Sequence, residues 1–269
     1  MKKNNKNIRE NRPDPSAPFW VWGLHVMEEF AMTQPSAIEE VKFLPSFEQK
    51  KANARLIAEL RARGTPCNLI QDFQKTDMPK DAVHQGIAAL VRPFWSIELE
   101  DLQTINIAHS PSLLLICDQI VDPQNLGAII RASVAFGVNA ILLPERSTAT
   151  VTGAVVKASS GAIAHARLCR VGNLAAAMER LKEWGFWFTA LSPDGTEPIW
   201  NLDFLRNTAI VVGAEGQGVR ELIKKRSDFT AYIPQAKGIA SMNAAAAASV
   251  CLYEVMRQRR LAMPANTIY

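Results

Sequence analysis

Three polar turns in the second half of the chain carry residues that could bind or act on a ligand. The first contains Asp122 and Pro123, which predict a turn, and Asn125, which is placed to cap the following helix. Arg131 comes six residues after Asn125. An amide and a planar guanidinium suit a phosphodiester, which a guanidinium can contact through two hydrogen bonds. By itself this segment fits an ordinary helix cap and a surface arginine equally well.

The second turn is rich in glycine and follows an apolar run. Gly213, Gly216 and Gly218 would let a ligand approach the backbone closely. Their order, G-x-x-G-x-G, differs from the G-x-G-x-x-G dinucleotide fingerprint and comes late in the chain, which counts against an NAD site. Glu215 lies inside this turn, and its carboxylate must find a cation or a backbone donor.

The third turn, residues 233–243, leads directly into an alanine-rich stretch. Ser241 or Asn243 is a normal N-cap for the helix that this stretch predicts. The small side chains of residues 244–248 indicate that this helix packs very closely against a neighbour.

These turns follow predicted strands, at the position where open α/β sheets bind ligands. The near-continuous apolar run 113–118 is typical of a strand buried on both faces of a parallel sheet. Further strands are predicted at 139–143, 165–171, 186–191, 208–212 and 230–233, and helices at 126–136, 174–184, 219–225 and 243–260. This alternation predicts an α/β fold with a doubly wound parallel sheet and helices on both faces.

The chain divides by composition into four parts. Residues 1–17 are expected to form a disordered basic arm, and residues 18–95 a small α/β domain. In that domain, helices are predicted after Gly23 and over 49–63, with strands at 41–44 and 67–71. Residues 96–110 are mixed and polar and are interpreted as a linker, and residues 111–269 as the second domain.

Composition narrows the class of protein. The chain is 48% hydrophobic and 21% charged, with a net charge of +4, which is typical of a soluble globular protein and compatible with a polyanionic partner. We find no run long enough to cross a membrane and no signal peptide, so we expect a cytoplasmic protein. The four cysteines are scattered, without metal-ligand spacing, so we expect reduced structural thiols and no metal.

Taken together and in this order, the turns resemble the three motifs of the SpoU (TrmH-like) family of the SPOUT superfamily. These are D-x-x-x-D-P-x-N-x-G-x-x-x-R, G-x-E-G-x-G and I-P-x-x-G-x-x-S-L-N-x-S-x-A, matched over about residues 113–260. Residues 22–28 and 84–87 also resemble the family's small substrate-binding domain, which shares its α/β fold with RNA-binding ribosomal proteins. The resemblance implies an RNA 2′-O-ribose methyltransferase that uses S-adenosylmethionine. It also implies a deep trefoil knot in the C-terminal domain and a homodimer that packs through the first and last helices of that domain.

The resemblance also implies which residues hold the cofactor. By matched position they are Gly213, Ile233 and Met242, with Ala214 and Ser241 beside them. Two positions depart from the family pattern, since Met242 replaces a leucine and Ala245 replaces a serine. Methionine keeps the volume and apolarity of leucine, so packing against the cofactor should survive. Ala245 removes one hydroxyl group near the knot.

For catalysis, the resemblance implies that Arg131 acts on the 2′-hydroxyl together with the adjoining phosphate. An arginine is almost always protonated, so the hypothesis is that it positions the phosphate and stabilises developing oxyanion character. Asn125 and Asn243 would orient Arg131 or the target nucleotide. Glu215 would anchor the Arg131 guanidinium or a loop across the dimer.

Ribosomal RNA is favoured over transfer RNA as the substrate, because the chain has a separate N-terminal domain. The alternatives are a tRNA 2′-O-methyltransferase, a non-catalytic RNA-binding dimer of the same fold, and a SPOUT enzyme that methylates a base. A nucleotide-dependent oxidoreductase would need a glycine fingerprint at the first strand–helix turn, where this chain has Asp122-Pro123-Gln124-Asn125.

Overall fold

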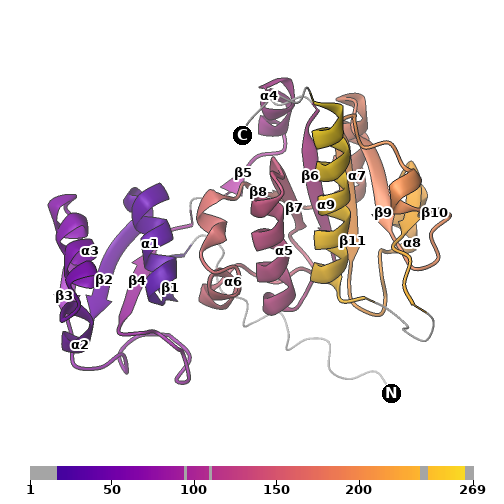
Figure 1. Cartoon of the computed structure of the whole chain (residues 1–269). Helices are drawn as coiled ribbons and strands as arrows, with labels where there is room; N and C mark the ends of the chain where they lie inside the picture. Colours follow the sequence, from indigo (N-terminus) through magenta and orange to yellow (C-terminus); the bar gives the residue numbers. More distant parts are fainter. Residues whose placement is uncertain (1–16, 94–95, 109–110, 237–241, 264–269) are drawn as a thin grey trace, which may run out of the picture. The chain divides into compact units, whose positions relative to one another are not determined.

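The computed structural model describes residues 17–93, 96–108, 111–236 and 242–263. The chain forms two compact units (Figure 1). The first unit combines the chain up to residue 94 with residues 150–164, and the second contains the rest. Nearly all of the basic arm expected over residues 1–17 lies outside the described residues, as does Ser241.

The first unit is built on a four-stranded sheet in the order β1-β4-β2-β3. β4 runs antiparallel to both of its neighbours, and β2 and β3 are parallel. Its elements are β1 (Phe19–Trp22), α1 (Leu24–Thr33), β2 (Ile38–Phe43), α2 (Pro45–Glu48), α3 (Lys51–Ala62), β3 (Cys67–Leu69) and β4 (Ile87–Val91). The helix expected after Gly23 is confirmed, and the φ of 102° at Gly23 is one that favours glycine.

Helix α6 (Gly153–Ala158) packs against β1 of the first unit, although the sequence analysis assigned it to the second domain. This packing is possible because Gly153 has no side chain. A Cβ atom there would lie 2.2 Å from the Trp20 carbonyl oxygen and 2.3 Å from the Trp22 ring. The close approach of α6 to β1 therefore requires a glycine, and no local hydrophobic pattern reveals it.

The second unit contains an eight-stranded sheet in the order β10-β12-β9-β11-β6-β7-β8-β5. Every neighbouring pair is parallel. The strands are β5 (Ser96–Ile97), β6 (Leu113–Asp118), β7 (Ala140–Pro144), β8 (Leu168–Val171), β9 (Trp187–Leu191), β10 (Glu197–Pro198), β11 (Thr208–Gly213) and β12 (Phe229–Tyr232). The predicted α/β class and parallel sheet are confirmed, whereas the knot stays a prediction.

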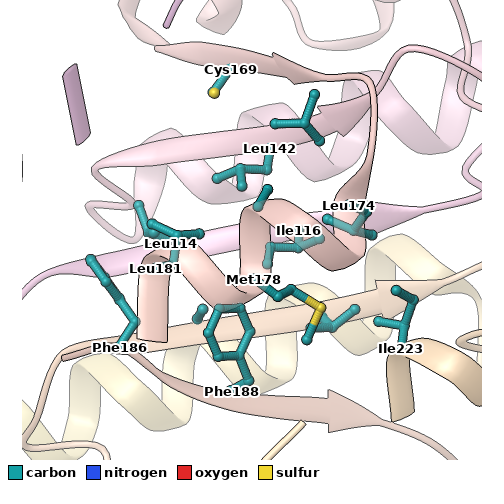
Figure 2. Close-up of a cluster of buried hydrophobic side chains, with 14 of the residues drawn as sticks. Leu114, Ile116, Leu142, Cys169, Leu174, Met178, Leu181, Phe186, Phe188 and Ile223 are labelled. Carbon is teal, nitrogen blue, oxygen red and sulfur yellow. The ribbon is translucent and has the colours of Figure 1, made fainter. Parts of the chain in front are cut away.

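Helices cover both faces of this sheet. α5 (Pro123–Ala135) and α9 (Ala244–Ala262) lie side by side on one face (Figure 1), as the alanines at the start of α9 predicted. On the other face, α7 (Leu174–Glu183) packs Met178 and Leu181 against Ile116 and Phe188 of the strands (Figure 2). α8 (Glu221–Arg226) contributes Ile223 to the same cluster. Among the described residues, no helix has the length and apolarity that would span a bilayer.

The segment interpreted as a linker, residues 96–110, contains ordered elements. β5 pairs with β8 at the edge of the large sheet, and α4 (Asp101–Ala108) follows. Leu102 is fully buried in the core, and Ile105, one turn later, packs against it. A single apolar face on a short helix is hard to distinguish within a polar stretch, which explains why the sequence indicated a linker.

The four cysteines are free, and their burial predicts their reactivity. Burial raises the pKa of Cys117 and of Cys251 to about 12, and burial with nearby carboxylates raises that of Cys169 to about 12. Only roughly one in 10,000 of these thiols is then ionised at pH 8. Burial also raises the pKa of Cys67, and Arg61 opposes this, but Cys67 is only half-buried.

We therefore expect iodoacetamide at pH 8 to label only Cys67 in the native protein and all four cysteines in denaturant. Intact-mass and peptide mass spectrometry would measure both. Labelling of Cys117 in the native protein as fast as that of Cys67 would contradict the prediction.

Candidate active site

The glycine-rich turn after β11 folds back on itself so tightly that only glycine fits at its start. A Cβ atom on Gly213 would lie 2.0 Å from the carbonyl carbon of Gly218 and 2.2 Å from the Val219 nitrogen. The Gly218 N–H donates to the Ala214 carbonyl oxygen at 2.8 Å, closing the turn. Gly216 and Gly218 have φ values of +83° and +68°, which favour glycine. The turn therefore exposes a preformed stretch of backbone.

A cavity of about 430 Å³ opens beside this turn. It lies at the carboxyl ends of β9, β11 and β12, and the start of α9 closes one side. Four of the five residues predicted to hold the cofactor line it: Gly213, Ala214, Ile233 and Met242. The volume is in the range of small-molecule sites, which combine apolar walls with a few polar groups. Accessible backbone and apolar walls are suited to an adenosyl group.

We expect Gly213→Ala to weaken binding of the cofactor strongly, because the added methyl group must push the turn apart. Overpacking of this kind costs about 1–3 kcal/mol. The loss should appear in calorimetric titration with S-adenosylhomocysteine, with a lower melting temperature. Gly172→Ala is a suitable control for the general cost of replacing a glycine, since the φ of Gly172, like that of Gly213, is not in the left-handed region, and the nearest atom to its Cβ position is Glu145 Oε2 at an ordinary contact distance of 3.5 Å. Equal cofactor affinities in the two variants would refute the role of the turn.

Asn243 joins the three turns. Its Nδ2 donates to Asn125 Oδ1 at 2.8 Å and to Glu215 Oε2 at 3.2 Å. Its Oδ1 accepts from the backbone nitrogens of Ala245 at 2.9 Å and Ala246 at 3.3 Å, so Asn243 is the N-cap of α9. One amide beside the cavity therefore links residues that are far apart in sequence, in the first turn of α5, after β11 and at the start of α9.

The structure shows which residue caps α5 and where Arg131 lies on that helix. α5 begins at Pro123, so its N-cap is Asp122, which accepts from the Gln124 nitrogen at 3.0 Å; Asn125 was expected to cap this helix. Because α5 begins three residues earlier than predicted, the Asn125 side chain is available to Asn243. Arg131 lies on the exposed side of the same helix, about 9 Å further along its axis.

An ion pair that the sequence analysis did not anticipate also connects the first two turns. Asp118, at the end of β6, is completely buried. Its carboxylate accepts from the Arg220 nitrogen at 2.9 Å, from Nε at 2.7 Å and from Nη2 at 2.6 Å. A charged residue that ends an apolar strand must have a partner. That signal was present in the sequence, but it did not identify Arg220.

A second polar group in the cavity also escaped the sequence analysis. Ser192 and Asp194, just after β9, and Lys224 of α8 line the cavity with the cofactor residues. The Ser192 hydroxyl and the Lys224 ammonium hold the pKa of Asp194 below its ordinary value. Glu221 and Asp194 raise the pKa of Lys224. Asp194 is therefore a carboxylate at neutral pH.

Comparison with known proteins places these features in context. Residues 112–253 match the SpoU rRNA Methylase family, and residues 20–95 match the family described as RNA 2′-O ribose methyltransferase substrate binding. The chain is 35% identical over 242 residues to a 23S rRNA (guanosine-2′-O-)-methyltransferase of Vibrio vulnificus, covering 89% of this chain and 97% of that protein. It is 40% identical over 211 residues to an uncharacterized tRNA/rRNA methyltransferase of Synechocystis, covering 77% of this chain but only 54% of that protein.

A solved structure shares the fold. The SpoU methyltransferase AviRb of Streptomyces viridochromogenes, in complex with AdoMet, matches with a TM-score of 0.76 at 22% identity. The match covers 96% of this chain and 95% of the other, so it includes both units.

Proposed function

Because the chain belongs to the SpoU rRNA methylase family, we propose that it transfers a methyl group from S-adenosylmethionine to a ribose 2′-hydroxyl of ribosomal RNA. The observation that carries this proposal is the Asn125–Asn243–Glu215 cluster beside the cavity. It brings the polar residues of all three motifs to one edge of a space suited to the cofactor.

Ribosomal RNA is the favoured substrate because the Vibrio vulnificus relative, which this chain matches over nearly its whole length, is named for 23S rRNA. Residues 20–95 match a substrate-binding family, which supports the proposal that the first unit binds the RNA. Transfer RNA is the alternative, since the name of the Synechocystis relative includes both RNA classes.

The cofactor, when bound, supplies an electrophilic methyl group on a positively charged sulfur. The chain must then hold a poor nucleophile, the ribose hydroxyl, in line with that methyl group. In our proposal the Arg131 guanidinium binds the adjoining phosphate and stabilises the oxygen as the hydroxyl proton passes to solvent water and the oxygen takes the methyl group. Asn125 and Asn243 orient the nucleotide at the mouth of the cavity, and Glu215 holds the Asn243 amide in place.

The experiment that tests the proposal is a map of 2′-O-methylated nucleotides in RNA from cells with and without this gene. One ribosomal position should lose its methyl group in the deletion and regain it when the wild-type gene is restored. A missing methyl group on transfer RNA alone would select the alternative substrate. If every 2′-O-methyl group is retained, the proposed activity is wrong.

We further propose that the enzyme is a cytoplasmic homodimer that needs no metal. The dimer surface would be the outer side of α5 and α9, where Tyr253 is 52% and Val250 is 40% exposed. Large apolar side chains exposed on neighbouring turns of one helix favour a covered surface.

We expect the purified protein to have twice the 29.7 kDa chain mass in light scattering. Tyr253→Glu should shift it towards the monomer, because a carboxylate is costly to bury in an interface. Leu222→Glu, at an apolar residue that is 57% exposed and lies on α8, which packs against α7 on the other face of the sheet, should leave the mass unchanged. A Tyr253→Glu protein that is still fully dimeric would exclude this surface.

A further inference from the structure

The loop after β9 is held rigidly at one side of the cavity. The Ser192 nitrogen donates to the Ala231 carbonyl oxygen at 2.9 Å, and the Thr196 nitrogen donates to the Thr230 carbonyl oxygen at 3.0 Å. Both ends of the loop are therefore hydrogen-bonded to the backbone of β12. Gly195 approaches the β12 backbone so closely that a Cβ atom would lie 2.5 Å from the carbonyl carbon of Ala231. The side chain between these anchor points, Asp194, is therefore presented from a fixed backbone.

One buried and one partly buried side chain hold the Asp194 carboxylate. Ser192 is only 7% exposed, and its hydroxyl donates to Asp194 Oδ1. The Lys224 side chain is 16% exposed, and its Nζ lies 3.3 Å from Asp194 Oδ2. Lys224 also has a closer partner, Glu221, at 2.6 Å, so Asp194 is not needed to neutralise it. The Asp194 side chain is nevertheless 74% exposed and lines the cavity, so its remaining acceptor capacity is accessible to a ligand there.

Sheet order separates this carboxylate from the reacting end of the site. Asn125 follows β6, the glycine turn follows β11, and Asp194 follows β9, and these strands are successive neighbours in the sheet. Two strand spacings correspond to about 10 Å. If the methyl group lies beside Asn125 and Asn243, the nucleoside must extend across the glycine turn towards Asp194. This step rests on the proposed function.

We propose that Asp194 accepts a hydrogen bond from the nucleoside of the cofactor and thereby contributes to the choice of ligand. A carboxylate is an acceptor only, so its partner must be a donor. The donors on this nucleoside are the 6-amino group of adenine and the ribose hydroxyls. Ser192 and Lys224 are positioning residues, because they fix the carboxylate without needing to touch the ligand.

The test is calorimetric binding of S-adenosylhomocysteine and three analogues to wild-type, Asp194→Ala and Asp194→Asn proteins. One analogue has an oxo group in place of the 6-amino group, and the others lack the 2′- or the 3′-hydroxyl. Asp194→Ala should weaken S-adenosylhomocysteine binding about tenfold, as expected for loss of a hydrogen bond to a charged group. For the analogue that lacks the donor contacted by Asp194, the loss of affinity caused by Asp194→Ala should fall below about threefold. This comparison is a double-mutant cycle between the side chain and the ligand group. Asp194→Asn keeps an acceptor oxygen and should recover part of the affinity.

Asp203→Ala is the matched control. Asp203 is an exposed carboxylate whose pKa is also lowered, by the Leu205 N–H and by Arg206, but it lies before β11, away from the cavity. The Asp203→Ala protein should bind each ligand with the wild-type affinity. Unchanged binding by Asp194→Ala, or the same penalty with every analogue, would overturn the inference and leave the methyltransferase proposal intact. A wild-type protein without affinity for S-adenosylhomocysteine would overturn both.

Discussion

Arg131→Ala is expected to lower the rate of methyl transfer by at least about a hundredfold, the loss typical when one stabilising donor is removed from a transition state. The cofactor affinity should stay within about twofold, because Arg131 is not among the described residues that line the cavity. Arg131 lies on the exposed side of α5, and alanine is the best helix former, so the fold should tolerate the change. Single-turnover methylation of the RNA substrate and calorimetry with S-adenosylhomocysteine would measure the two quantities separately.

Arg131→Lys separates charge from geometry. It keeps the positive charge but loses the planar fork that contacts a phosphate through two bonds, so it should restore only part of the rate. Arg180→Ala, on the exposed side of α7 across the sheet, controls for the loss of a surface cation. If Arg131→Ala kept the wild-type rate, the role assigned to this arginine would be wrong.

Arg220→Ala is expected to destabilise the protein by about 3–5 kcal/mol, the cost of leaving a buried charge without its partner. Asp118 is completely buried, and the substitution would leave its carboxylate with the backbone nitrogen of residue 220 as its described donor. The free energy of unfolding from urea denaturation would measure the loss. The turn that carries Glu215 should loosen too, so cofactor affinity should fall with stability.

The double variant Asp118→Asn, Arg220→Ala should be more stable than Arg220→Ala alone, because it removes the unpaired charge. Arg206→Ala breaks the exposed pair with Asp203 at 2.8 Å and should cost less than about 1 kcal/mol. If Arg206→Ala and Arg220→Ala lowered the free energy of unfolding equally, the burial of Asp118 would not determine the energy of the Asp118–Arg220 pair.

Much of the second unit could be predicted from the sequence, because its signals are local. A strand buried on both faces is an unbroken apolar run, as over residues 113–118, and α7 shows its apolar face at helical spacing. The N-cap of α9 depends only on the residue before the helix, so Asn243 could be named in advance as one of two candidates. The order of the three motifs indicated the family and the residues around the cavity.

The tertiary structure decided which distant residues meet. The Asp118–Arg220 pair spans 102 positions, and it forms only because β6 and β11 are neighbours in the sheet. The packing of α6 against β1 and the position of Asp194 beside the cavity likewise depend on how separate segments come together. Hydrophobic periodicity records which face of an element is buried, but not which other element covers it. Strand order and close backbone approach decide that partner, and the local sequence specifies neither.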